Sequence, residues 1–424
     1  MRIGVAGGIV LLFNNAIGPG APQTAPLFQA AGWVPTTLAF ALYAGLSGVA
    51  SLFVCEAMQA VPGNRRFGAR VEWSTLVHFY TPSARLSQWT QLWLYGTLIG
   101  NVVASLVQSA HTWDHVLIDV VGATCGLGWP LSSSSSSSSP WLSSRTPASS
   151  PAPWPSWLSW PETVCVANHT SQTLSPFEDV RLIGTTGLLA VVILVVPLTM
   201  KADLGETLFV QKAAFGITLL VFVQWIWVSL RHGVAWERVP AFGPAATDLR
   251  GVHGGGDDLG SVLGVIMLNF ASISTVPAWV NARAPHASIH ATIGGSVVLC
   301  FATYLLIGLI PALAFAFPPG TTVLSVLASD PTCRAVGYVF ALVVLMASVP
   351  VFMLIARDNL LETDAVASTA RATWLTHVLP WLLVLPFQSG GAVVTLNAWS
   401  GLLFASITNF VLPFSIFRAS HAFR

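Results

Sequence analysis

The densest set of helix-breaking and polar residues lies near the start of the chain, between Asn14 and Pro26. Three prolines and two glycines fall within residues 18–26. An internal proline removes a backbone hydrogen bond and clashes with the preceding turn, so an α-helix cannot continue through this stretch. The unwound backbone can offer N–H and C=O groups to the carboxylate and the amine of a small zwitterion. We therefore expect Gly18, Pro19 and Gly20 to bind substrate, with an ordinary proline kink as the alternative.

A second interruption follows much later, between Asn269 and Pro277. It is polar, β-branched and proline-bearing, and apolar residues flank it on both sides. Its candidate substrate-binding residues are Asn269, Ser272, Ser274 and Thr275. Interrupted helices in corresponding positions of two halves are the best sequence indication of a transporter with inverted repeats and a binding site near the bilayer midplane.

The elements that must position these residues are membrane helices. Of 424 residues only 8% are charged and 54% are hydrophobic, whereas about 25% of the residues of a soluble protein are charged. A helix needs about 20 mostly apolar residues to cross the bilayer core. Ten segments qualify, and they cover residues 3–30, 34–60, 88–120, 180–199, 207–230, 259–284, 291–317, 334–356, 372–389 and 391–414. The second interruption lies in the sixth, which is the first of the second five. This predicts an all-α integral membrane protein with a five-plus-five inverted repeat, broken in helices 1 and 6.

The Lys and Arg residues predict the orientation, because they are enriched on the cytoplasmic side. With the N-terminus inside, twelve lie inside: Arg2, Arg65, Arg66, Arg70, Arg85, Lys201, Lys212, Arg283, Arg357, Arg371, Arg418 and Arg424. Six lie outside: Arg145, Arg181, Arg231, Arg238, Arg250 and Arg334.

Three regions follow: residues 1–120 with helices 1–3, residues 121–179 as an outside loop, and residues 180–424 with helices 4–10. The loop is rich in Ser and Pro and is expected to be disordered. It carries a glycosylation sequon at Asn168, which only the outer or lumenal side can use. Cys125 and Cys165 flank its Ser/Pro segment and either pair as a disulfide or stay as two free thiols.

Other chemistry has weaker support. His111, Asp114 and His115 share a helical face and suggest a metal or proton site, or polar residues at the outer end of a helix. Glu56 near the end of helix 2 is interpreted as a cap or a gate contact with the Arg65–Arg66 region rather than a proton relay. The sequence contains no P-loop, no dinucleotide-binding motif and no Ser/His/Asp hydrolase motif, so we do not expect an enzyme. It has no stripe of basic residues that could bind nucleic acid, so we expect no nucleic-acid partner.

Several short sequence motifs follow one another along the chain. They are Asn15-Ala16-Ile17-Gly18-Pro19-Gly20, Gln29-Ala30-Ala31-Gly32-Trp33-Val34-Pro35, Cys55-Glu56-Ala57-Met58 with Pro62-Gly63-Asn64, Val71-Glu72-Trp73-Ser74-Thr75-Leu76-Val77, Val107-Gln108-Ser109-Ala110, Thr275-Val276-Pro277-Ala278-Trp279-Val280-Asn281, and Ser348-Val349-Pro350-Val351-Phe352 with Arg357-Asp358-Asn359-Leu360. Their order resembles the amino acid/auxin permease family of the amino acid–polyamine–organocation superfamily, over about residues 3–420 without the Ser/Pro insertion. Such permeases usually have eleven helices, and this chain is expected to end after its tenth.

The resemblance implies a Na⁺ site between helices 1 and 8. Asn15 immediately precedes the first break, and Ser348 stands two residues before Pro350. Oxygen ligands of this kind suit a hard cation. Alternatively, Ser348 bonds back to its own preceding turn and Asn15 caps a helix end.

Together these features predict a secondary active transporter of amino acids. A neutral substrate is favoured because few acidic residues lie within the spans. Na⁺ or H⁺ would be the coupling ion, no other cofactor is expected, and the chain would be a multi-pass protein of the plasma membrane or of a vacuolar or lysosomal membrane. The alternative is a transport-inactive homologue that acts as a nutrient sensor or complex partner.

Overall fold

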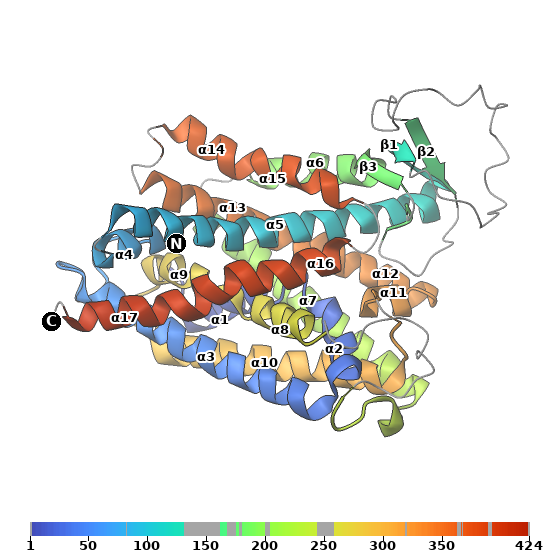
Figure 1. Cartoon of the computed structure of the whole chain (residues 1–424), viewed down its shortest axis with the longest axis horizontal. Coiled ribbons are helices and arrows are strands. Elements are labelled where there is room, and N and C mark those ends of the chain that lie inside the picture. The colour runs from blue at the N-terminus through green and yellow to red at the C-terminus, as the bar shows by residue number, and fades with distance from the viewer. Residues whose placement is uncertain are drawn as a thin grey trace.

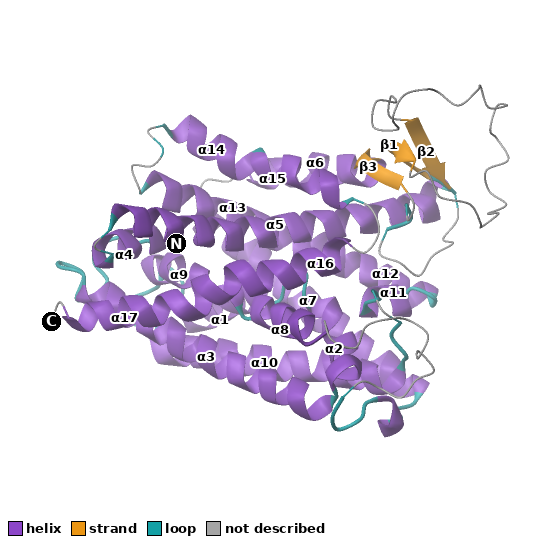
Figure 2. Cartoon of the chain, in the orientation of Figure 1, coloured by secondary structure: helices purple, strands orange, loops and turns teal. Residues whose placement is uncertain are grey.

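The computed structural model describes residues 2–81, 83–130, 162–167, 175–177, 180–199, 204–243, 258–318, 320–362, 366, 368–388 and 392–422. Helices run along the long axis of the molecule, and a small sheet lies at one end of it (Figures 1 and 2). The α-helices up to the second break are α1 (Val5–Ala16), α2 (Thr24–Ala31), α3 (Trp33–Ala60), α4 (Trp73–Tyr80), α5 (Ala84–Val121), α6 (Thr186–Thr199), α7 (Leu204–His232) and α8 (Asp258–Asn269).

The α-helices that follow are α9 (Val276–Ala282), α10 (Ile289–Ala314), α11 (Val323–Leu327), α12 (Pro331–Val339), α13 (Met346–Leu361), α14 (Thr369–His377), α15 (Leu379–Val384), α16 (Ala392–Trp399) and α17 (Leu412–Ala422). Short 3₁₀ helices are η1 (Ala21–Gln23), η3 (Trp236–Arg238), η4 (Ala271–Thr275) and η6 (Leu385–Phe387). Two π-helical stretches are η5 (Phe340–Leu345) and η7 (Ser400–Val411).

Within the described residues, seven helices are long and apolar enough to cross a membrane. They cover Trp33–Ala60, Ala84–Val121, Leu208–His232, Val262–Ala282, Ile289–Ala314, Pro331–Leu361 and Val393–Ala422. Large apolar side chains on them point outward: Leu38, Leu220 and Val298 are 63%, 71% and 67% exposed. Such apolar exposure is unfavourable in water and suits lipid. The chain is therefore an all-α membrane protein apart from its small sheet.

The other three predicted spans are not among these seven. Residues 3–30 divide into α1, η1 and α2, as the prolines predict. Residues 180–199 begin with a strand before α6, and residues 372–389 divide into α14, α15 and η6, with Pro380 and Pro386 at the starts of the last two. The structure thus shows the helical class, while the count of ten rests on the sequence.

The segment predicted to be disordered contains regular structure. Strands β1 (Thr124–Pro130) and β2 (Glu162–Val166) pair antiparallel, and β3 (Val180–Thr185) pairs with the other edge of β1. The prediction is therefore wrong for β1 and β2. Low apolar content predicted an unfolded loop, but pairing with β3, next to the membrane helices, supplies backbone partners. The Ser run and the sequon Asn168 lie outside the described residues.

Cys125 and Cys165 face each other across β1 and β2 and form a disulfide. This confirms pairing over free thiols. The sheet lies at the end of the molecule away from both marked chain ends (Figure 1). The other three cysteines, Cys55, Cys300 and Cys333, are free and buried.

Sidedness can be tested through this disulfide. We expect a membrane-impermeant maleimide to label intact cells only after mild reduction, because Cys125 and Cys165 then become the accessible thiols. The Cys125→Ser/Cys165→Ser variant is the control and should remain unlabelled, since the remaining thiols are buried. Labelling that requires permeabilised cells would reverse the predicted orientation.

Candidate functional site

The two helix breaks have matching construction. In the first, α1 has 12 residues, a short 3₁₀ helix follows, and α2 has 8 residues. In the second, α8 has 12 residues, η4 follows, and α9 has 7 residues. Backbone angles of φ −76° and ψ 88° take Ile17 out of the α-helical region directly after α1. The prolines and glycines thus produce two similar helix–break–helix units.

A single tyrosine connects the two breaks. Tyr304, on α10, is fully buried. Its hydroxyl lies 2.5 Å from the carbonyl oxygen of Ala16 and 3.2 Å from that of Asn269. These carbonyls end α1 and α8, where no helical partner is available to them. The breaks therefore lie beside one another, on either side of one hydroxyl group.

Each of the three predicted residues of the first break lies near the side-chain amide of a different asparagine. A methyl group on Gly20 would overlap the side-chain oxygen of Asn269, so Gly20 is in close contact with the second break. The carbonyl of Pro19 accepts a 3.3 Å hydrogen bond from the Nδ2 atom of Asn397. Gly18 has more room, since a Cβ there would lie 3.9 Å from the Oδ1 atom of Asn101. The structure thus brings Gly18, Pro19, Gly20 and Asn269 together.

The three hydroxyl residues of the second break have more local roles. The Ser274 hydroxyl donates to the carbonyl of Ala271 at 3.2 Å, and that of Thr275 donates to the carbonyl of Ser272 at 2.6 Å. Ser272 is half-buried. The Ser274 N–H donates to the Oδ1 atom of Asn409 at 3.1 Å. These bonds hold η4 in its 3₁₀ form, while the oxygen lone pairs of both hydroxyls stay available.

Buried polar atoms without a hydrogen-bond partner are numerous on the elements around the breaks. Among the described residues they include Nδ2 and Oδ1 of Asn15, Nε2 and Oε1 of both Gln23 and Gln108, Oγ of Ser105 and Ser400, Nδ2 of Asn269 and Oδ1 of Asn397. An unpaired buried polar group costs about 1–3 kcal/mol, so such a set favours a polar ligand or water. Asn101, Ser105 and Gln108 follow helical spacing on α5 and share one face.

None of these side chains is charged. Among the side chains whose burial is described, the buried carboxylates are Glu72 and Asp114. Glu72 contacts Arg70 and Asn281, and Asp114 contacts Thr124 near the sheet. The donors and acceptors at the breaks are therefore neutral amides, hydroxyls and backbone groups, which suit a ligand without net charge.

Asn15 and Ser348, the candidate cation ligands, have different surroundings. Both are buried, with exposed fractions of 5% and 2%. Asn15 has no side-chain partner among the described residues, so it caps no helix end there. Ser348 donates to the carbonyl of Leu345 at 2.8 Å, which is the back-bond that the sequence left open. Its lone pairs can still face a cation.

Gln211 of α7 joins the neighbours of these two residues. Asn14 donates to its carbonyl at 2.7 Å and to its side-chain oxygen at 2.9 Å. Gln211 in turn donates to the carbonyl of Ala347 at 2.9 Å. Helices α1 and α13 are thus connected one residue away from Asn15 and Ser348. An unpaired amide oxygen and a hydroxyl fit the oxygen-donor chemistry of Na⁺.

Comparison of the chain with protein-family models and with curated proteins gave no match. The geometry of the two breaks therefore carries the functional assignment.

The polar residues on α5 near the sheet are structural anchors. The Oδ1 atom of Asp114 accepts hydrogen bonds from the Thr124 hydroxyl at 2.6 Å and the Gly187 N–H at 2.8 Å. His111 contacts the carbonyl of Gln388 at 3.0 Å. In the described ranges no group of three His, Cys, Asp or Glu side chains could hold a metal ion.

Glu56 lies beside a residue that the sequence did not suggest. Its carboxylate is 3.8 Å from the Nε2 atom of His421 on α17. This contact links α3 to the C-terminal helix.

The sequence did not indicate that Tyr304, Asn101, Asn397, Asn409 and Gln211 would lie at or near the breaks. Each is a polar residue within an otherwise apolar segment. Their isolation was the one available signal. A single amide or phenol group forms no sequence pattern from which its contact partner could be inferred.

Proposed function

We propose that this chain is a secondary active transporter that binds a neutral amino acid at the two helix breaks. The observation that carries the proposal is the placement of the two matched breaks on either side of the Tyr304 hydroxyl. Unwound backbone in a membrane protein is tolerated where it lies inside the protein or lines a cavity. Paired breaks of this kind are where transporters with inverted repeats bind substrate.

The hydrogen-bonding groups at the two breaks indicate the substrate class. Backbone N–H groups at the start of α2 or α9 can bind a carboxylate, because a helix N-terminus carries a positive partial charge. Free carbonyls and the amides of Asn101, Asn269 and Asn397 can accept hydrogen bonds from an ammonium group. Among the residues that the structure describes at the breaks, no carboxylate is present to balance a cationic side chain, so a neutral amino acid fits best.

The same repeat suggests how access could alternate. The α1–η1–α2 and α8–η4–α9 units would belong to two five-helix repeats, and one repeat would rock against the other around the bound substrate. Glycine contacts between α8 and η7, where Gly264 and Gly401 meet without room for a methyl group, let the helices of such a bundle approach closely.

Flux in proteoliposomes tests the proposal. Purified protein would be reconstituted and offered a pool of labelled amino acids under an ion gradient. Saturable, gradient-dependent uptake supports a transporter. Saturable binding without flux would indicate the nutrient sensor, and neither binding nor flux would contradict both functions.

The coupling ion has its own expected result. We expect uptake in Na⁺ to exceed uptake in choline at fixed pH, and Asn15→Ala and Ser348→Ala each to raise the Na⁺ concentration needed for half-maximal uptake. The reason is the loss of one oxygen ligand in each variant. Ser329→Ala, an exposed hydroxyl in the loop after α11, is the control. Wild-type uptake that ignores Na⁺ but follows a pH gradient would replace this site with proton coupling.

A further inference from the structure

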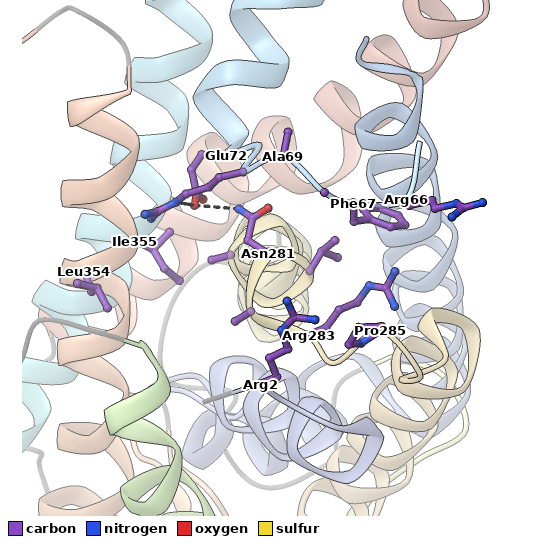
Figure 3. Close-up of a pocket in the computed structure, with 15 residues that line it drawn as sticks. Arg2, Arg66, Phe67, Ala69, Glu72, Asn281, Arg283, Pro285, Leu354 and Ile355 are labelled. Atoms are coloured by element: carbon purple, nitrogen blue, oxygen red, sulfur yellow. Dashed lines mark hydrogen bonds and ion pairs between the residues drawn. The ribbon is translucent and has the colours of Figure 1, made fainter. Parts of the chain in front are cut away.

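A basic pocket lies at the end of the molecule opposite the sheet. It has a volume of about 560 Å³ and lies between the N-terminal residues, the loop before α4, the end of α9 and the middle of α13. Four arginines line it: Arg2, Arg66, Arg70 and Arg283. Figure 3 shows Arg2 and Arg283 on one side of the space, with Glu72 and Asn281 in contact across from them. None of these residues belongs to the substrate site proposed above.

The positive charge in the pocket is only partly balanced. Arg70 pairs with Glu72 at 3.0 Å and with Asp358 at 2.8 Å. Burial raises the pKa of Glu72, against the opposing effects of Arg70 and Asn281. Arg2, Arg66 and Arg283 form no ion pair with any carboxylate that the structure describes. Three guanidinium groups of the cavity thus have no ion-pair partner among the described carboxylates, while Glu72 in its lining is paired with Arg70.

Backbone pairing keeps two of these arginines adjacent. Ile3 forms a parallel bridge with Arg283. The Ile3 N–H donates to the carbonyl of Ala282 at 2.9 Å, and the Ala284 N–H donates to the carbonyl of Ile3 at 2.8 Å. Ile3 is fully buried, which fixes the bridge further. Arg2 and Arg283 are therefore positioned together despite their like charges.

Phe67 orients Arg283. Its ring lies 4.6 Å from the guanidinium carbon, a cation–π contact. Among the described non-glycine residues, Phe67 alone has a positive φ, at 55°. A bulky residue in this region is strained and persists only where its surroundings hold it. Arg283 also donates to the carbonyl of Ala287 at 2.9 Å, while its Nε is buried without a partner.

Asn64 maintains the loop that places Phe67. It is fully buried, donates to the carbonyl of Met58 at 2.9 Å, and accepts from the Ala69 N–H at 3.0 Å. The Phe67 N–H donates to the Asn64 carbonyl at 2.9 Å. The arginine pocket is thus built before any ligand arrives.

We propose that this pocket binds an anion carrying several phosphate groups, of the inositol phosphate class. Guanidinium groups bind phosphate oxygens in pairs of parallel hydrogen bonds. Basic pockets between membrane helices on the cytoplasmic side suit phosphoinositide headgroups, and the predicted orientation places this pocket on that side. The headgroup of a lipid and a free inositol phosphate share this chemistry. A bound anion would hold the start of α1 against the end of α9, which are the ends of the two broken helices that lie away from the breaks.

Binding to the purified full chain tests this site directly and needs no transport. The probes are dioctanoyl phosphatidylinositol 4,5-bisphosphate, inositol 1,4,5-trisphosphate, and dioctanoyl phosphatidylinositol as the lipid without the extra phosphates. We expect saturable binding of at least one multiply phosphorylated probe, weaker binding of plain phosphatidylinositol, and affinity that falls as salt rises. Tighter binding of the bisphosphate lipid than of the trisphosphate assigns the site to a headgroup, and the reverse order assigns it to the soluble ligand.

Variants separate the pocket from general surface charge. Arg2→Gln/Arg66→Gln/Arg283→Gln should weaken binding about tenfold or more, since it removes three guanidinium groups that can form charge-assisted hydrogen bonds with phosphate. Arg66→Gln alone changes an exposed residue and should fold normally while weakening binding. Arg85→Gln removes one exposed charge near the same end of the molecule, outside the pocket, and should bind as wild type. Wild-type affinity in both pocket variants, or no saturable binding of any phosphorylated probe, would overturn the proposal.

Discussion

Gly20→Ala is expected to lower amino acid uptake about tenfold or more, a loss of about 1.4 kcal/mol or more in binding. The new methyl group would overlap the side-chain oxygen of Asn269, and the Cγ atom of Asn269 would lie only 3.1 Å away. Because Asn269 is buried, either its amide group would have to turn away or the two breaks would have to separate, and both changes disturb the proposed site. The measurement is the initial rate of uptake in proteoliposomes at matched protein density.

The neighbouring glycine supplies the matched control. A methyl group on Gly18 would meet its nearest atoms at 3.9 and 4.0 Å, which is ordinary contact. Gly18→Ala should therefore retain most of the uptake, whereas Gly18→Leu should not, because the larger side chain would enter the space beside Asn101. Equal uptake in Gly20→Ala and wild type would place the substrate away from the breaks.

Tyr304→Phe should abolish most uptake and also destabilise the protein by about 1–3 kcal/mol. Removing the hydroxyl leaves the carbonyls of Ala16 and Asn269 without the donor that lies between them. The aromatic ring keeps its contacts with Phe40 and Phe270, at 5.6 Å in each case, so the packing of the core is preserved. Thermal unfolding in detergent and uptake in proteoliposomes report the two effects separately.

Tyr43→Phe is the comparison for this variant. Tyr43 lies on α3, is half-buried, and packs edge-on against Phe410 at 5.2 Å. The hydrogen bonds to the carbonyls of Ala16 and Asn269 come from Tyr304 and not from Tyr43, so Tyr43→Phe should keep both stability and uptake. If Tyr304→Phe also behaved as wild type, Tyr304 would not be the link between the two breaks.

The positions of both breaks could be predicted because their cause is local. Pro19, Pro22 and Pro277 restrict the backbone wherever they stand, and the structure places helix interruptions beside each of them. That the breaks meet could not be predicted from composition, since it depends on how the ends of α1 and α8 are brought to Tyr304 of α10. Tyr304 shows the difficulty: in the sequence it is one tyrosine in an apolar helix.

The sheet and the arginine pocket were missed for a related reason. The segment of β1 and β2 has the composition of an unfolded loop, yet each strand finds its partner far along the chain: Thr124 pairs with Val166, and Gly126 pairs with Thr185. The sequence predicted that Arg2, Arg66, Arg70 and Arg283 lie on one side of the membrane. It could not indicate that all four would line one cavity, because a bridge between Ile3 and Arg283 brings together residues 280 positions apart.

The π-helical geometry of η7 has a consequence for motion in the C-terminal span. A π turn holds more residues than an α turn, so tightening one π turn to α geometry rotates everything beyond it by about 100° per residue released. The N-terminal end of this stretch carries Ser400 near Gly100 of α5, while beyond its C-terminal end Phe417 stacks on Phe53 of α3 at 3.8 Å. The extra residues of the π turns lie between the contact with α5 and the contact with α3. One end of the span can follow α5 through a change of register while the other end remains docked on α3.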